Sequence, residues 1–147
     1  MAAIHWGANW GYAVRPAQRE FAHRLIDSAN IDVVLGHSSH HPMGIEVYRD
    51  HLILYGCGDF LNDYEGIGGY ESFRSDLTVA YFPSLDTATG RLTRLALAPM
   101  QIRHFRLNHA SAADARWLEQ TLTHQGKRYG TRVAPESDML VVRWNGH

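Results

Sequence analysis

The sequence has little cysteine and no excess of either charge. One cysteine among 147 residues cannot form an internal disulfide, and it excludes zinc ribbons and fingers, which need several thiolate ligands. The 14 lysines and arginines nearly balance the 15 aspartates and glutamates, so we expect neither a nucleic-acid partner nor an anionic membrane surface. No apolar run approaches the roughly 20 residues of a membrane-spanning helix.

The first residues also lack the pattern of a signal peptide. Met1 to Ile4 contain no basic segment, and no apolar run of about 7–15 residues follows them. The sequence as written therefore predicts a cytoplasmic chain. Residues able to carry chemistry begin at once with His5-Trp6-Gly7. We therefore expect the chain to be the later part of a larger domain.

Histidine, by contrast, is abundant, with ten residues in the chain. Imidazole and carboxylate side chains together can build a transition-metal site. His5 follows one short apolar run, and His37 and His40 follow the β-branched run that ends at Gly36. Because ligands bind at the carboxyl ends of strands in open α/β sheets, these three histidines are the predicted metal ligands. The Gly-His-x-x-His spacing alone is a weak signature.

The hydrophobic pattern predicts an α/β fold, with α+β as the alternative, built as layers around a sheet. Apolar residues at helical spacing predict a helix that begins near Pro16 and ends near Ala29, and the Ser111-to-Asp114 capping pattern starts a second helix. Arg49-Asp50 is a predicted two-residue hairpin turn without the favoured glycine. The predicted strands span residues 4–6, 32–35, 45–48, 51–55, 77–82, 92–97, 102–107 and 139–144.

Three sequence blocks occur in an order that resembles the CapA family of bacterial capsule and poly-γ-glutamate synthesis proteins, which are similar in fold to calcineurin-like metallophosphatases. The blocks are His5-Trp6-Gly7, then Gly36-His37-x-x-His40 with Gly44-Ile45-Glu46-Val47-Tyr48, then Leu54-Tyr55-Gly56-x-Gly58-Asp59-Phe60. The resemblance predicts that residues 1–108 are the C-terminal half of a CapA-type domain. Residues 109–147 are the predicted C-terminal helix and strand packed on it.

The resemblance implies a layered metallophosphatase sandwich with two divalent ions of the manganese, iron or zinc class at the strand ends. It assigns His5, His37 and His40 as ligands and catalytic residues. We expect Trp6, Asn9, His41 and Asp59 to contact a phosphoester or acidic-polymer substrate. Asp59 stands where relatives commonly have asparagine, so it is predicted to line the site or to add a ligand. The resemblance also implies association with the cell envelope.

The family's carboxylate and asparagine ligands come from the part of the domain before the first block, and residues 1–4 contain no Asp, Asn or His. Two interpretations therefore stay open. The chain is either a hydrolase domain completed by an upstream half or by a second copy, or a catalytically incomplete module that binds metal or acidic polymer, including a fragment of a split enzyme. A third hypothesis, Cys57 as a nucleophile with His37 or His40 as its base, is less favoured than a small buried side chain.

Overall fold

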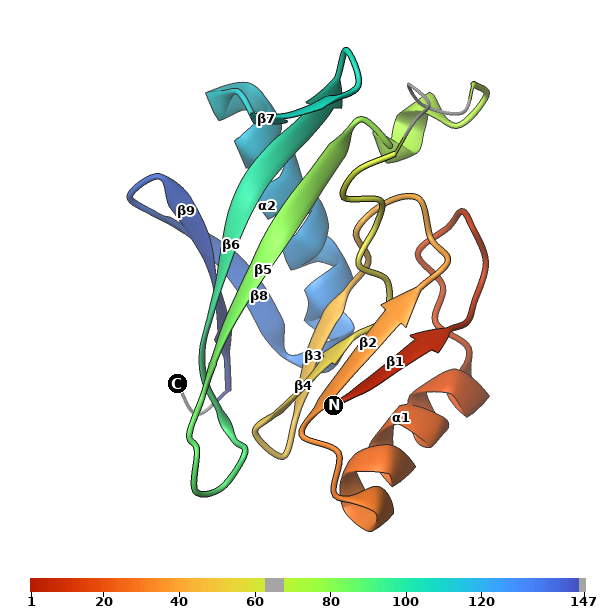
Figure 1. Ribbon diagram of the computed structural model, residues 1–147, viewed down its shortest axis with the longest axis vertical. Coiled ribbons are helices and arrows are strands. Elements are labelled where there is room, and N and C mark those ends of the chain that lie inside the picture. The colour runs from red at the N-terminus through yellow and green to blue at the C-terminus, as the bar shows by residue number, and fades with distance from the viewer. Residues whose placement is uncertain (63–67, 146–147) are drawn as a thin grey trace.

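The computed structural model describes residues 1–62 and 68–145, which form two β-sheets and two α-helices (Figure 1). In the first sheet the parallel strands β1, β2 and β4 lie side by side, and β3 pairs antiparallel with β4. The carboxyl ends of three strands therefore meet at one edge. In spatial order the strands are β1 (Ala2–His5), β2 (Val33–His37), β4 (His51–Leu54) and β3 (Ile45–Tyr48).

The second sheet is antiparallel throughout. Its strands, in spatial order, are β5 (Leu77–Leu85), β6 (Leu92–Arg103), β9 (Met139–Trp144) and β8 (Thr131–Glu136), with β7 (Arg106–His109) paired to the end of β6. Two short 3₁₀ helices, η1 (Glu71–Phe73) and η2 (Lys127–Tyr129), lie in the connections.

Both helices begin where the sequence predicts, and α1 also ends there. α1 (Pro16–Ala29) starts at a proline and is C-capped by Asn30, whose φ of 53° is left-handed. α2 (Ala112–Gly126) is capped by Ser111, which accepts a hydrogen bond from the Asp114 N–H at 3.2 Å. Neither helix in the described part of the chain is long and apolar enough to cross a membrane.

Two apolar clusters fix the layers. α1 buries Ala22 and Ile26 against one face of the first sheet, where Val34 and Ile53 meet them. The opposite face packs against the second sheet in the main core, to which α2 also contributes. The buried residues of that core are Val33, Ile45, Leu52, Leu54, Leu77, Val79, Leu92, Leu95, Leu97, Leu118, Leu122, Val133, Leu140, Val142 and Trp144.

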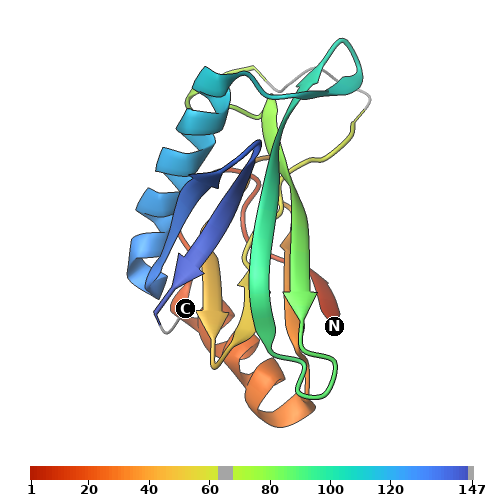
Figure 2. The same ribbon diagram turned by 90° about the vertical axis from the view of Figure 1, so that its left-hand side faces the viewer.

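The sandwich is closed on one side and open on the other. On the closed side β3 contacts β8, α2 packs against both, and the Thr131 hydroxyl donates a hydrogen bond to the Ile45 carbonyl at 2.8 Å. Figure 2 shows α2 beside β8 at this side. The open side presents β1 and β5, and no strand in the described ranges pairs with the outer edge of either. The unpaired edges of β1 and β5 therefore lie on the same side of the sandwich.

The structure confirms the α/β class and most predicted strands. The Arg49-Asp50 turn is confirmed, with φ values of 50° and 64°, the two positive values that a type I′ turn requires. The strand predicted over 102–107 is wrong in extent, because the chain reverses at His104-Phe105 between β6 and β7. β8 was not predicted. The boundary after residue 108 stays a prediction, although both parts share the main core.

Candidate functional site

His5 and His37 lie side by side at the carboxyl edge of the first sheet. They are register partners at the ends of β1 and β2. Their Nδ1 atoms are 3.1 Å apart and their ring centroids 5.0 Å apart. Both side chains are exposed. In this contact one nitrogen donates a proton to the other, so an ion could replace the shared proton.

His40 and Asp59 form a second pair beside the first sheet's edge. His40 lies in the loop after β2 and Asp59 follows β4, and Nδ1 of His40 is 2.9 Å from Oδ2 of Asp59. The Asn62 amide donates to the same oxygen at 3.3 Å. A carboxylate in this position holds the imidazole in the tautomer with the proton on Nδ1. Asp59 therefore orients His40.

The three predicted ligands do not form one cluster: His5 pairs with His37, and His40 pairs with Asp59. Within residues 1–62 and 68–145, no group of three His, Cys, Asp or Glu side chains is arranged to hold a metal ion. The His5–His37 pair nevertheless fits part of such a site. Two nitrogens that are each about 2.0–2.1 Å from a tetrahedral zinc lie about 3.3 Å apart, close to the separation observed here. The donor set thus fits two ligands of an ion and leaves the others to be supplied.

His41 is fully buried and its ring nitrogens are both used within the fold. The Gly11 N–H donates to Nε2 at 3.1 Å, and Nδ1 lies 3.2 Å from the Pro42 carbonyl. The rings of Tyr12 and Phe73 pack against it at centroid distances of 4.6 and 4.8 Å. Burial is the largest influence on this imidazole and lowers its pKa. His41 therefore joins two loops as a neutral ring, and the predicted substrate contact gains no support from its placement.

The other predicted substrate residues divide between the edge and the interior. Asn9 lies at the edge, where its carbonyl accepts the His40 N–H at 3.0 Å and its side-chain oxygen accepts from the Ser38 hydroxyl at 3.2 Å. Ser38 has a φ of 125°, a strained backbone of the kind found at functional sites. Trp6 packs toward α1 instead. Substrate contact stays a prediction for all four residues, Trp6, Asn9, His41 and Asp59.

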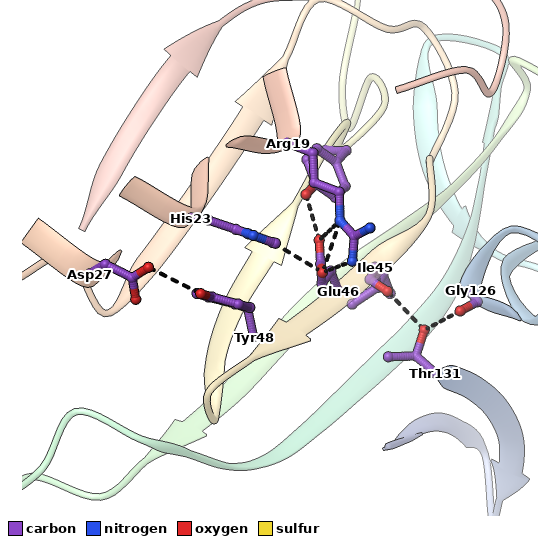
Figure 3. A network of polar contacts seen from close by, with 9 residues as sticks. Arg19, His23, Asp27, Ile45, Glu46, Tyr48, Gly126 and Thr131 are labelled. Carbon is purple, nitrogen blue, oxygen red and sulfur yellow. Dashed lines mark hydrogen bonds and ion pairs between the residues drawn. The ribbon is translucent and has the colours of Figure 1, made fainter. Parts of the chain in front are cut away.

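A buried carboxylate behind the site had no predicted role. Glu46 accepts a hydrogen bond from Arg19 (2.6 Å to Nη2) and lies 3.1 Å from Nε2 of His23 (Figure 3). It also accepts a hydrogen bond from the Tyr55 hydroxyl at 2.5 Å. Burial alone raises the pKa of Glu46, but the hydrogen bonds from Arg19 and Tyr55 outweigh it, and the net pKa is lowered. The sequence signal was a single charge between apolar residues of β3.

Cys57 has the environment of an inert thiol. It packs against the main core, and burial raises its pKa to about 11. A thiol with that pKa stays protonated at neutral pH and is a poor nucleophile. This favours the structural interpretation of Cys57 over the cysteine-hydrolase hypothesis.

Comparison with known proteins identifies the region that carries the histidines. A family model described as "Bacterial capsule synthesis protein" matches residues 1–64, which include β1 to β4 and the pairs His5–His37 and His40–Asp59. Over these residues the chain belongs to the CapA family. The CapA region thus contains every site residue that was predicted from the sequence.

Individual relatives extend the comparison beyond this region. A probable polyglutamine synthesis accessory protein of Mycobacterium tuberculosis is 51% identical over 141 residues, which are 96% of this chain and 37% of that protein. The capsule biosynthesis protein CapA of Bacillus anthracis is 32% identical over 59 residues, 40% of this chain and 14% of that protein. The PGA biosynthesis protein CapA of Bacillus subtilis is 36% identical over 59 residues, 40% of this chain and 15% of that protein. The chain thus spans little more than a third of the M. tuberculosis protein.

Proposed function

We propose that this chain is the C-terminal half of a metal-dependent hydrolase domain of the metallophosphatase type that serves bacterial capsule or poly-γ-glutamate synthesis. Membership in the CapA family supports the biological setting. The name of the M. tuberculosis relative, an accessory protein of polymer synthesis, supports a role beside another protein. The two stacked sheets, with parallel strands ending at histidines, support the sandwich architecture.

The contact between His5 and His37 carries the proposal. Two imidazole nitrogens 3.1 Å apart at adjacent strand ends are spaced as two ligands of one divalent ion. In this class of enzyme the ion activates a water for attack on an ester. His40, whose Nδ1 lies 2.9 Å from Asp59, is the proposed third ligand or proton acceptor. The exposed Asn9 amide offers polar contacts beside it.

The ligand set on this chain is incomplete for that chemistry. A two-ion centre needs several carboxylates to balance its charge. In the described ranges Asp59 reaches His40, but no three His, Cys, Asp or Glu side chains come together. We propose that the remaining ligands come from an N-terminal half or from a second copy. The isolated chain is then expected to bind about one divalent ion weakly and to show little phosphoesterase activity.

Isothermal titration with Zn²⁺ or Mn²⁺ tests this proposal, together with an assay on bis(p-nitrophenyl) phosphate. Binding should disappear in His5→Ala and His37→Ala and persist in His109→Ala, whose exposed histidine lies on β7. Two tight sites and robust turnover would contradict the incomplete site. Absence of any metal binding would contradict the metal assignment.

A second candidate is a module that binds metal or acidic polymer without catalysis. The separation of the histidines into two pairs favours it. Adding the upstream segment of a relative in trans distinguishes the two candidates. Activity that appears only in the mixture supports the hydrolase, whereas metal binding with no turnover in the mixture supports the module.

A further inference from the structure

Trp6 connects the three strand ends at the histidine edge. It follows His5, and because side chains alternate along a strand, its ring lies on the opposite face of the sheet, toward α1. Its backbone N–H donates to the His37 carbonyl at 3.0 Å. Its indole Nε1–H donates to the Tyr55 carbonyl, just after β4, at 2.9 Å. Trp6 therefore connects the end of β1 both to β2 and to the end of β4.

Gly36 makes this crossing possible. A Cβ atom at Gly36 would lie 2.2 Å from Nε1 of Trp6 and 2.4 Å from the Tyr55 carbonyl oxygen, far inside any allowed contact. The hydrogen bond from the Trp6 indole to the Tyr55 carbonyl therefore passes directly over Gly36. The Gly36 carbonyl in turn accepts the Cys57 N–H at 3.0 Å. The glycine of the Gly-His-x-x-His block thereby makes room for Trp6.

Tyr55 is a rigid anchor for this bond. Its ring is fully buried, and its hydroxyl donates to Glu46 at 2.5 Å. Arg19 and His23 reach Glu46 from α1, as Figure 3 shows. The indole of Trp6 also stacks on the Tyr55 ring at a centroid distance of 6.1 Å. The strand ends are therefore connected through Tyr55 to helix α1.

We propose that Trp6 is the positioning residue for the His5–His37 pair. β1 has only four residues and pairs with β2 alone among the described strands, so its end is prone to fraying. The indole bond to Tyr55 holds that end in place and thereby sets the distance between the two imidazoles. We call the hydrogen bond from the Trp6 indole to the Tyr55 carbonyl the clamp. The assignment of the His5–His37 pair to an ion rests on the proposed function, whereas the clamp rests only on the contacts described above.

Trp6→Phe tests the clamp, because it keeps an aromatic ring and removes the indole N–H. Trp117→Phe is the matched control, since Trp117 is a half-buried tryptophan on α2. In the metal-free protein, the imidazole ¹⁵N signals of His5 and His37 should shift in Trp6→Phe and stay in place in Trp117→Phe. Titration with Co²⁺ should show about tenfold weaker binding in Trp6→Phe alone, the loss typical for residues that orient metal ligands.

Several outcomes would overturn the inference. Unchanged imidazole signals in Trp6→Phe would do so, because a residue with a purely packing role leaves them in place. If the wild-type chain binds no Co²⁺, the proposed function fails, but the metal-free spectra still decide on the clamp. If Trp6→Phe does not fold, hydrogen exchange in the wild-type chain decides instead. The indole N–H and the backbone N–H of Trp6 should then be protected together, and rapid exchange of the indole N–H alone would refute the clamp.

Discussion

Removing the carboxylate of Glu46 should reverse the effect of a second substitution at Tyr55. Glu46 is 3% exposed and accepts hydrogen bonds from Arg19 and Tyr55. In the wild-type chain, Tyr55→Phe removes one hydrogen bond to a charged acceptor. In Glu46→Ala, by contrast, the Tyr55 hydroxyl is buried without its acceptor. Tyr55→Phe should therefore destabilise the first protein and stabilise the second.

The magnitudes follow from the exposure of each partner. Breaking a buried ion pair costs about 3–5 kcal/mol, but the Arg19 side chain is 44% exposed and is rehydrated by water once Glu46 is gone. The Tyr55 side chain is 1% exposed, so its orphaned hydroxyl accounts for about 1–3 kcal/mol. With the other lost contacts, Glu46→Ala should lower the free energy of unfolding by about 3 kcal/mol. Adding Tyr55→Phe should restore about 1–2 kcal/mol.

Urea denaturation at pH 7, followed by far-ultraviolet circular dichroism, measures all four proteins of this cycle. Glu20→Ala is the control, because the exposed Glu20 pairs with Arg24 on the surface of α1 and its loss should change stability by less than about 0.5 kcal/mol. Equal losses from Tyr55→Phe in both backgrounds would refute the reasoning, because they would show that Glu46 and Tyr55 act independently.

Three further predictions concern stability. The pKa of Glu46 is lowered in the folded state, so the stability that its carboxylate contributes is complete above the ordinary glutamate pKa of 4.5 and is lost as pH falls through the folded pKa. Urea midpoints measured from pH 7 to pH 3 should therefore fall less steeply in Glu46→Gln than in Glu20→Gln. Ser111→Ala removes the N-cap of α2 and should cost about 1 kcal/mol in urea denaturation, whereas Ser72→Ala at an exposed position should be neutral. Gly126→Ala should lower the thermal midpoint, because a Cβ there would lie 2.6 Å from the Thr131 carbonyl oxygen, whereas Gly68→Ala has open space around it and should not.

Elements whose apolar residues repeat at a regular spacing were predictable from the sequence. The reversal before β7 and the strand β8 were not. α1 carries its apolar residues at helical spacing, and Pro16 marks its start. The reversal at His104-Phe105 uses two left-handed residues that are not glycine, so no turn signal precedes β7. β8 contains Pro135, which argues against a strand in sequence, yet β8 lies at a sheet edge, where proline is tolerated.

The site was predictable only as far as its location. Strand ends followed by histidine predicted the edge where His5 and His37 meet, because parallel strands end together. Which of the adjacent residues His40 and His41 turns inward depends on the aromatic rings of Tyr12 and Phe73, which come from segments distant in sequence. Glu46 received no predicted role, because its partner Arg19 lies 27 residues before it in the sequence.

The open side of the sandwich governs how the isolated chain behaves at high concentration. Along β5, alternate amides point away from β6, which leaves a row of donors and acceptors that can template another strand. Pro83 removes one donor, the Leu77 N–H already donates to the Arg74 carbonyl at 2.8 Å, and the bulge between Ser84 and Leu85 bends the end of the row. The stretch able to pair with another strand therefore narrows to residues 78–82. Self-association of the chain should therefore grow with concentration through β5. Sedimentation velocity at increasing chain concentration should detect it, and a sedimentation coefficient that does not change with concentration would refute this role of β5.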